Sequence, residues 1–268
     1  MVVNEGLPQI VSQAAAPEGV AASGNEKGIS VPGPPGGGKI KLVSATVAPG
    51  VLGAYFDALH AAHGAQHWWP GRTRFEIVVG AILTQNTSWR NVEAAIGNLR
   101  KARLLSPLAI RRARFATIAS ALRPAGYFRQ KTRTLKGFVD FLFAKYRGTL
   151  ALMLSVPAQA LREQLLGLRG IGPETADSIL LYAGRRPVFV VDAYSRRILE
   201  RHSIVHGKTT YGEIQQLFEN DLPRDHLVFN EFHALIVETG KLHCRAQNPL
   251  CSECPLARFL PQSTLTGT

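Results

Sequence analysis

Three cysteines near the end of the chain are the residues whose type and spacing most directly indicate chemistry. Cys244, Cys251 and Cys254 follow a C-x6-C-x2-C pattern, and the sequence has no other cysteine. An odd number of thiols crowded into one short segment suits metal binding better than a disulfide framework. The pattern therefore predicts a metal site near the C-terminal end.

A second segment with chemical potential is LRGIGPETADSIL, residues 168–180, which places two glycines around one isoleucine. Gly167 can end one helix and Pro173 can begin the next, so the segment between them is a tight hairpin. Without side chains at Gly170 and Gly172, backbone amides at the start of the second helix can approach a phosphate oxygen, and the helix dipole favours that anion. An ordinary turn between two helices is the alternative, and the glycines alone do not separate the two.

The elements that must position these groups are helices. From about residue 50 onward, apolar residues recur at helical spacing, and strand-like alternation is nearly absent. The sequence therefore predicts an all-α fold, with residues 185–192 as the one extended-looking run. Three apolar stripes carry the pattern: Leu52, Tyr55, Phe56 and Leu59; Leu161, Leu165 and Leu168; and Ile214, Leu217 and Phe218.

Capping signals mark where some of these helices should begin and end. Thr210 and Glu213 have capping-box spacing, and Ser155 with Pro157 can open the helix of the second stripe. Gly240 can end a helix near the C-terminus, because glycine tolerates the left-handed conformation that follows a final turn.

Composition and charge narrow the class of protein. The chain has 268 residues, 46% of them hydrophobic, and its 31 Lys plus Arg against 19 Asp plus Glu give a net charge of +12. Such an excess favours a polyanionic partner through counterion release, although a solvated basic surface is the alternative. No apolar run approaches the roughly 18 residues of a membrane span, and no secretory signal is visible. We therefore expect a cytoplasmic protein, nucleoid-associated in a bacterium, with no membrane partner.

The N-terminal region differs in composition from the rest of the chain. Residues 1–45 are rich in Gly, Pro, Ala and Ser and include the run VPGPPGGGK. Such a segment cannot bury enough apolar surface to fold, so the sequence predicts a disordered tail.

Residues 168–199 together resemble the helix-hairpin-helix, Gly/Pro-rich loop and aspartate signature of base-excision DNA glycosylases of the endonuclease III superfamily. The resemblance extends upstream to GAILTQNTSW at 80–89 and GYFRQK at 126–131, and downstream to the cysteines. It implies a two-lobed all-α fold in which residues 76–186 form a central bundle containing the hairpin. Residues 46–75 and 187–268 would form the second lobe, which carries the cysteines, and a damaged base would be flipped into the cleft between the lobes.

The resemblance assigns catalytic roles to two carboxylates. Asp192 matches the catalytic aspartate of the superfamily, where a carboxylate can stabilise an oxocarbenium-like sugar and orient or deprotonate water. Its alternative role is a helix cap. Glu174 occupies the position where bifunctional members carry a Schiff-base lysine, and a carboxylate cannot form that imine. The sequence thus predicts a monofunctional glycosylase with Glu174 in the same pocket; charge at a helix N-terminus is its alternative role.

Aromatic residues indicate which bases the pocket would take. The segments HWWPG at 67–71 and LTQNTSW at 83–89 are most similar to the endonuclease III-like 3-methyladenine DNA glycosylases. Alkylated purines are cationic leaving groups, and aromatic faces attract them by stacking and cation–π interaction. The resemblance therefore assigns base stacking to Trp68 and Trp89, with Trp69 as the next candidate, and core packing is the alternative for each.

Further positions are expected to contact duplex DNA. Gln85 and Asn86 lie where the superfamily inserts a polar side chain into the gap left by the flipped nucleotide, although both could be helix caps. Arg129, Lys131 and Arg133, near Tyr127 and Phe128, suit a loop that grips phosphates. The expected DNA-binding residues are Gln85, Asn86, Arg129, Lys131, Gly170, Gly172 and Thr175.

The cysteine spacing matches the first three ligands of the superfamily's four-iron, four-sulfur cluster. The fourth ligand should come at position 260, and that residue is Leu260. The chain could hold a 4Fe-4S cluster with another fourth ligand, a 3Fe-4S cluster, or none. His243, next to Cys244, is poorly placed to reach the same metal.

The sequence as a whole thus predicts a monomeric, monofunctional DNA glycosylase that hydrolyses the N-glycosidic bond of damaged bases, alkylated purines above all, in double-stranded DNA. A bifunctional endonuclease III-type glycosylase and AP lyase on oxidised pyrimidines is one alternative. A non-catalytic DNA-binding protein is the other, and the presence of Asp192 speaks against it.

Overall fold

The structure is a computed structural model that describes residues 50–66, 68 and 71–261. The tail predicted for residues 1–45 lies outside the described residues. Within the described ranges every regular element is helical and no residue is in a strand, so the predicted all-α class is confirmed. None of the helices described is long and apolar enough to cross a membrane.

The elements follow one another with short connections. The first half of the described chain contains α1 (Val51–His63), α2 (Arg74–Leu83), α3 (Trp89–Lys101), α4 (Pro107–Arg112), α5 (Phe115–Ala121), η1 (Arg123–Ala125), α6 (Phe128–Tyr146) and α7 (Leu150–Leu154). The second half contains α8 (Ala158–Leu166), α9 (Pro173–Ser178), the π-helical η2 (Ile179–Ala183), α10 (Ala193–Arg201), α11 (Tyr211–Asp221), α12 (His226–Leu242), η3 (Cys251–Glu253) and η4 (Ala257–Phe259).

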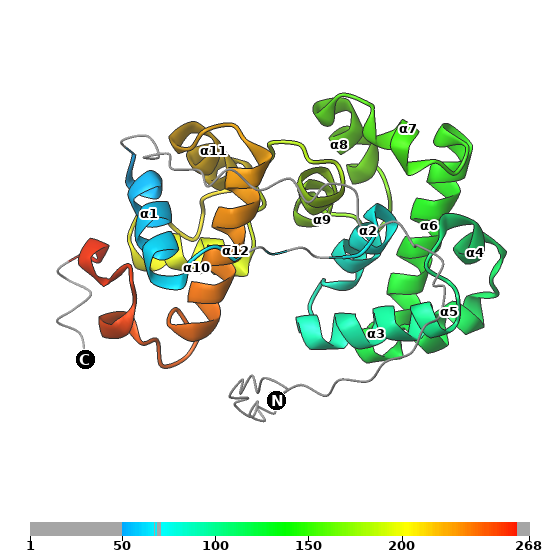
Figure 1. The fold of residues 1–268 in the computed structure, drawn as a ribbon, viewed down its shortest axis with the longest axis horizontal. Helices are drawn as coiled ribbons and strands as arrows, with labels where there is room; N and C mark the ends of the chain where they lie inside the picture. Colours follow the sequence, from blue (N-terminus) through cyan, green and yellow to red (C-terminus); the bar gives the residue numbers. More distant parts are fainter. Residues whose placement is uncertain (1–49, 67, 69–70, 262–268) are drawn as a thin grey trace, which may run out of the picture. The chain divides into compact units, whose positions relative to one another are not determined.

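The helices pack in two groups that share the segment η2. In one group α2 packs on α3, α6 and α9, while α4, α5 and α7 lie against α6 (Figure 1). In the other group α12 packs on α1 and α10, and α1 also contacts α11. The element η2 contacts both α2 and α12, so the segment after the hairpin joins the groups. The two predicted lobes and their boundaries stay a prediction.

Apolar stripes explain why these helices pack as they do. The stripe of α1 is buried as expected. In the second stripe Leu161 and Leu165 of α8 are buried, whereas Leu168 lies past the end of α8 and is only half-buried. Leu217 of the third stripe is 38% exposed because only Ile214 and Phe218 of α11 face the core. The capping box of Thr210 and Glu213 is present at the start of α11, as predicted.

Two predicted helix boundaries were wrong. The helix α8 begins after Pro157, while Ser155 instead ends α7 and donates its hydroxyl to the carbonyl of Leu152. Gly240 does not end α12, which continues to Leu242. A Cβ atom at Gly240 would lie 2.2 Å from the ring of Tyr194, so this glycine is needed for the close approach of α10 and α12.

The hairpin forms as the sequence predicts. Gly167 follows the last residue of α8 and Pro173 opens α9. Asp177, fully buried in α9, accepts two hydrogen bonds from Arg162 of α8, at 2.7 and 3.0 Å, and one from Gln215 of α11 at 2.9 Å. These contacts fasten the hairpin to its neighbours. After Ser178 the helix widens into a π-turn, a feature that occurs often at functional sites.

Candidate active site and cysteine cavity

A cavity of about 300 Å³ brings the two predicted catalytic carboxylates together. Its walls come from α2, the loop before α3, the helices α9 and η2, and the facing ends of α10 and α12. Six of its lining residues carry the argument that follows: Asp192, Glu174, Trp68, Trp89, Tyr182 and His233.

Asp192 is both the N-cap of α10 and a wall residue of this cavity. Its Oδ1 accepts hydrogen bonds from the backbone N–H of Ser195 at 2.7 Å and from the Ser195 hydroxyl at 2.8 Å. Its Oδ2 lies 3.5 Å from Nε2 of His233. One oxygen thus holds the helix while the other stays available for chemistry, so capping and a role in the pocket are compatible.

The two carboxylates have opposite pKa shifts. Burial acts to raise the pKa of Asp192, but the contact with His233 and the hydrogen bonds from Ser195 outweigh it and lower this pKa below its usual value. Glu174, in the first turn of α9, is accessible to solvent, yet burial and the negative charge of Asp192 raise its pKa. Two neighbouring carboxyls with separated pKa values can carry different roles, with Asp192 ionised and Glu174 retaining its proton to higher pH.

Three further polar residues of the pocket, Tyr182, His233 and Lys241, were missed by the sequence analysis. The hydroxyl of Tyr182 lies 2.6 Å from Nδ1 of His233, and both side chains are buried. The only sequence feature that pointed to His233 was its place in the apolar run around Phe232 on α12. A histidine that merely packs in the core would show the same feature. Lys241, about two helical turns further along α12, also lines the pocket.

Two of the three tryptophans lie at the cavity. Trp68 and Trp89 both line the cavity, with ring centroids 6.5 Å apart in an edge-to-face arrangement. Trp89 also packs over α2, where a Cβ atom at Gly80 would lie 3.6 Å from its ring. Trp69 lies outside the described residues.

Gln85 and Asn86 lie in the loop before α3 but have different surroundings. The side-chain amide of Gln85 donates to the carbonyl of Gly170 at 2.9 Å and to the hydroxyl of Thr175 at 2.8 Å. Gln85 therefore links this loop to the hairpin. Asn86 is exposed and has a left-handed backbone, with φ 52°. Thr175 is buried beneath Gln85, so its predicted place on the DNA-facing surface was wrong.

The two hairpin glycines have different reasons for being glycine. Gly170 has φ 88°, and a Cβ atom there would lie 2.2 Å from Oγ1 of Thr134. Internal geometry alone therefore requires glycine at this position. Gly172 has an extended backbone, and a Cβ atom there would meet nothing within 4 Å. No described part of the chain demands glycine at 172, so its surface is open to an external partner.

The basic segment at the start of α6 is only partly available to a polyanion. Arg129 and Arg133 are exposed, as is Tyr127, which is 70% accessible to solvent. Lys131 is instead buried, and its ammonium donates to the carbonyl of Ala125 at 2.6 Å. The prediction that Lys131 binds DNA was wrong, because its position on α6 points the side chain under η1.

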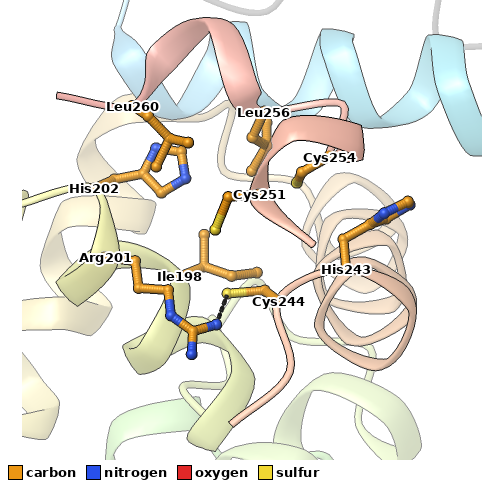
Figure 2. A pocket seen from close by; sticks show the side chains of 9 residues that line it. All are labelled: Ile198, Arg201, His202, His243, Cys244, Cys251, Cys254, Leu256 and Leu260. Carbon is orange, nitrogen blue, oxygen red and sulfur yellow. Dashed lines mark hydrogen bonds between the residues drawn. The ribbon is translucent and has the colours of Figure 1, made fainter. Parts of the chain in front are cut away.

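The cysteines line a second, smaller cavity of about 10 Å³ between α10 and the C-terminal segment (Figure 2). Its other walls come from the polar residues Arg201, His202 and His243 and from Ile198, Leu256 and Leu260, the last at the expected fourth-ligand position. Arg201 donates to Sγ of Cys244 at 3.0 Å, drawn as the dashed line in Figure 2.

The donor set of this cavity suits an iron–sulfur cluster with three protein ligands. Cys244, Cys251 and Cys254 all face one space, whereas the imidazole of His243 is turned to its side (Figure 2). Burial raises the pKa of the Cys254 thiol, and the neighbouring sulfurs of Cys244 and Cys251 add to this increase. Thiolates held this close repel one another until metal ions neutralise them. Within the described ranges, no three His, Cys, Asp or Glu side chains converge as ligands of a single ion.

Two family matches account for these two regions. Residues 79–224, which contain the hairpin and Asp192, match the HhH-GPD superfamily base excision DNA repair proteins. Residues 244–259, which contain the cysteines, match the iron–sulfur binding domain of endonuclease III.

Individual relatives agree with these matches. A protein of Methanocaldococcus jannaschii named as a DNA repair glycosylase is 45% identical over 198 residues, which cover 74% of this chain and 90% of the relative. Endonuclease III of Sulfolobus acidocaldarius is 28% identical over 192 residues, covering 70% of this chain and 83% of that protein.

Solved structures show the same fold. The H. pylori 3-methyladenine DNA glycosylase bound to 1,N6-ethenoadenine is similar with a TM-score of 0.61 and 29% identity, covering 70% of this chain and 96% of that chain. A non-covalent endonuclease III–DNA complex has a TM-score of 0.67 at 22% identity, covering 79% and 94% of the two chains. Because the family match spans the hairpin and Asp192, and the archaeal relative aligns over most of its length, the chain belongs to the HhH-GPD superfamily of base excision DNA repair proteins and is a DNA glycosylase.

Proposed function

We propose that the protein is a monofunctional glycosylase that hydrolyses the N-glycosidic bond of alkylated purines flipped out of duplex DNA, acting as a cytoplasmic monomer. The observation that carries the proposal is the pairing of Asp192 and Glu174 in one pocket lined by Trp68 and Trp89. A carboxylate stands at position 174, where a Schiff-base mechanism would need an amine. This arrangement favours water as the nucleophile.

In the proposed reaction Asp192 supplies the negative charge. As the bond between base and sugar breaks, positive charge develops on the sugar, and a fixed carboxylate stabilises it. The free Oδ2 of Asp192 can also orient and deprotonate the attacking water, since Oδ1 is occupied by Ser195. The products would be the free base and an abasic site.

The aromatic rings of the pocket and the opposite pKa shifts of its two carboxyl groups support a cationic substrate. An alkylated purine carries its own positive charge, so it leaves without a strong general acid. The rings of Trp68 and Trp89 attract such a base by stacking and cation–π interaction, and ionised Asp192 adds to the attraction. The H. pylori 3-methyladenine glycosylase, with 29% identity, supports the same class. A release assay with 3-methyladenine, 7-methylguanine, hypoxanthine, uracil and thymine glycol would test it.

The proposed DNA contacts come from exposed residues around the hairpin. Asn86, exposed and left-handed, is better placed than Gln85 to enter the gap left by the flipped base. Gly172 leaves the start of α9 open to a phosphate, and Arg129 with Arg133 adds positive charge.

One observation favours the bifunctional alternative. Lys241 lines the same pocket and lies 3.9 Å from Glu238, with half of its side chain exposed. Its amine could in principle attack the sugar of the flipped nucleotide and form a Schiff base. A covalent trapping experiment separates the two functions.

Borohydride reduction on DNA that contains an abasic site should give no covalent adduct with the wild-type protein. Glu174→Lys should give an adduct, because it places an amine in the pocket that contains Asp192. Glu174→Gln, of similar size but without an amine, is the matched control and should give none. The readout is the shifted band in a denaturing gel.

An adduct with wild-type protein would contradict the monofunctional assignment. Its loss in Lys241→Ala would then identify Lys241 as the nucleophile. Absence of base release from every lesion of the panel, with intact DNA binding, would support the non-catalytic alternative.

Leu260→Cys should increase retention of an iron–sulfur cluster in air. A fourth thiolate would complete the set of Cys244, Cys251 and Cys254, close the site against oxidant and slow the decay of absorption near 400 nm. Leu260→Ala, which removes packing without adding a ligand, is the control and should not slow this decay. If wild-type and Leu260→Cys proteins are both colourless, iron-free and equally heat-stable after anaerobic purification, the cysteines do not hold a cluster. A cluster there would brace the C-terminal segment, and base release needs no step through it.

A further inference from the structure

The buried imidazole of His233 has one nitrogen with a hydrogen-bond partner among the described residues and one without. Its Nδ1 is 2.6 Å from the Tyr182 hydroxyl. Its Nε2 is buried, makes no hydrogen bond to any residue that the structure describes, and faces Oδ2 of Asp192 at 3.5 Å. Most buried side-chain nitrogens are hydrogen-bonded, because an unpaired buried polar atom is costly. The unpaired atom points at the catalytic carboxylate.

Packing fixes the plane of this ring as well as its position. The indole of Trp68 stacks on it, with ring centroids 5.6 Å apart and an interplanar angle of 16°, and Phe189 approaches its edge at 6.3 Å. The ring therefore has little freedom to rotate, and Nε2 stays directed at Asp192.

The hydrogen-bond partners select one tautomer. If Nδ1 carried the only proton, the lone pair of Nε2 would face the lone pairs of an ionised carboxylate. With the Tyr182 hydroxyl donating to Nδ1, the proton sits on Nε2 and points toward Oδ2 of Asp192. The separation of 3.5 Å closes to a hydrogen bond by a small rotation of the carboxylate, or is bridged by one water.

We propose that His233, oriented by Tyr182, is a positioning residue that donates its Nε2–H toward Oδ2 of Asp192 and keeps this oxygen ionised and aimed into the pocket. The inference rests on the proposed hydrolytic role of Asp192. Among the described residues, the titratable groups that line the pocket with His233 are Asp192 and Tyr194 at the start of α10, Glu174 of α9, Tyr182 of η2 and Lys241 of its own helix. Of these, only Asp192 and Glu174 are acidic, and Asp192 is the one within 4 Å of Nε2.

The hydrogen bond that His233 donates determines in which direction the pH–rate profile should move when His233 is replaced. Removing His233 removes a cause that lowers the pKa of Asp192, while the burial that raises it remains. Because activity requires ionised Asp192, the acidic limb of the rate profile should move to higher pH. We expect a shift of about one pH unit in His233→Leu and a smaller one in His233→Gln, whose amide N–H can replace Nε2–H.

Tyr182→Phe tests the relay from the hydroxyl to the ring. It should lower the single-turnover rate about 10- to 100-fold, since loss of an outer partner releases the ring that it orients. Tyr55→Phe is the matched control: it removes an equally short bond, 2.6 Å from the Tyr55 hydroxyl to Nδ1 of His202, in the other buried Tyr–His pair. Both variants should lose similar thermal stability, but Tyr55→Phe should leave the pH profile unchanged.

A measurement that does not depend on enzymatic activity distinguishes failure of this inference from failure of the proposed function. Nitrogen NMR of the free wild-type protein should show His233 with its proton on Nε2, and Asp192→Asn should shift the signal of that nitrogen. An Nδ1–H tautomer in wild-type protein, or an unmoved acidic limb in His233→Leu, would overturn the inference. If no tested base is released but the NMR result is as expected, the proposed function fails and the geometry of the relay stands.

Discussion

Asp192→Asn is expected to abolish base release while binding of lesion-containing DNA is kept or tightened. The amide oxygen can still accept hydrogen bonds from Ser195, so the cap of α10 should survive. The charge that stabilises the sugar cation and the base that activates water are both lost. Together these effects should lower the single-turnover rate by at least about 10³-fold.

Tighter binding follows from electrostatics. The ionised carboxylate of Asp192 repels the phosphates around the flipped nucleotide, and a neutral amide does not. Fluorescence anisotropy with labelled duplexes would measure the affinity, and an unchanged melting temperature would show that the fold is intact. Full activity of Asp192→Asn on the preferred lesion would rule out the assignment of this residue.

The two hairpin glycines should respond to the same substitution in different ways. Gly170→Val should destabilise the protein by about 2–5 kcal/mol, because it forces a β-branched residue to positive φ and against Thr134. Gly172→Val should leave the free energy of unfolding nearly unchanged, since its backbone is extended and the added side chain meets nothing. It should instead weaken binding to all duplexes by about tenfold or more, the cost of one hydrogen bond to a charged phosphate.

Urea unfolding and anisotropy on undamaged and lesion-containing DNA would measure both effects. Gly207→Val is the control, because Gly207 is an exposed glycine with equally open surroundings. A loss of affinity in Gly172→Val that is confined to lesion-containing DNA would mean that the hairpin recognises the base rather than the backbone.

The sequence by itself determined the helical class, the hairpin, the capping box of Thr210 and Glu213 and the segment that carries the cysteines. These features depend on interactions within a few residues, such as apolar periodicity, glycine and proline placement and ligand spacing. The resemblance of the motif that spans the hairpin and its loop to a glycosylase family then pointed to Asp192 and Glu174, whose catalytic roles stay a proposal.

Only the tertiary structure decided which side each polar residue faces and which partner it meets. Lys131 and Gly240 were misassigned because the carbonyl of Ala125 and the ring of Tyr194 come close only after the helices pack. His233 was missed for the same reason. Its partners Tyr182 and Asp192 precede it by dozens of residues and approach it only where η2, α10 and α12 meet. Local patterns report what a helix can bury, whereas the charge and hydrogen bonding of a pocket depend on distances between helices.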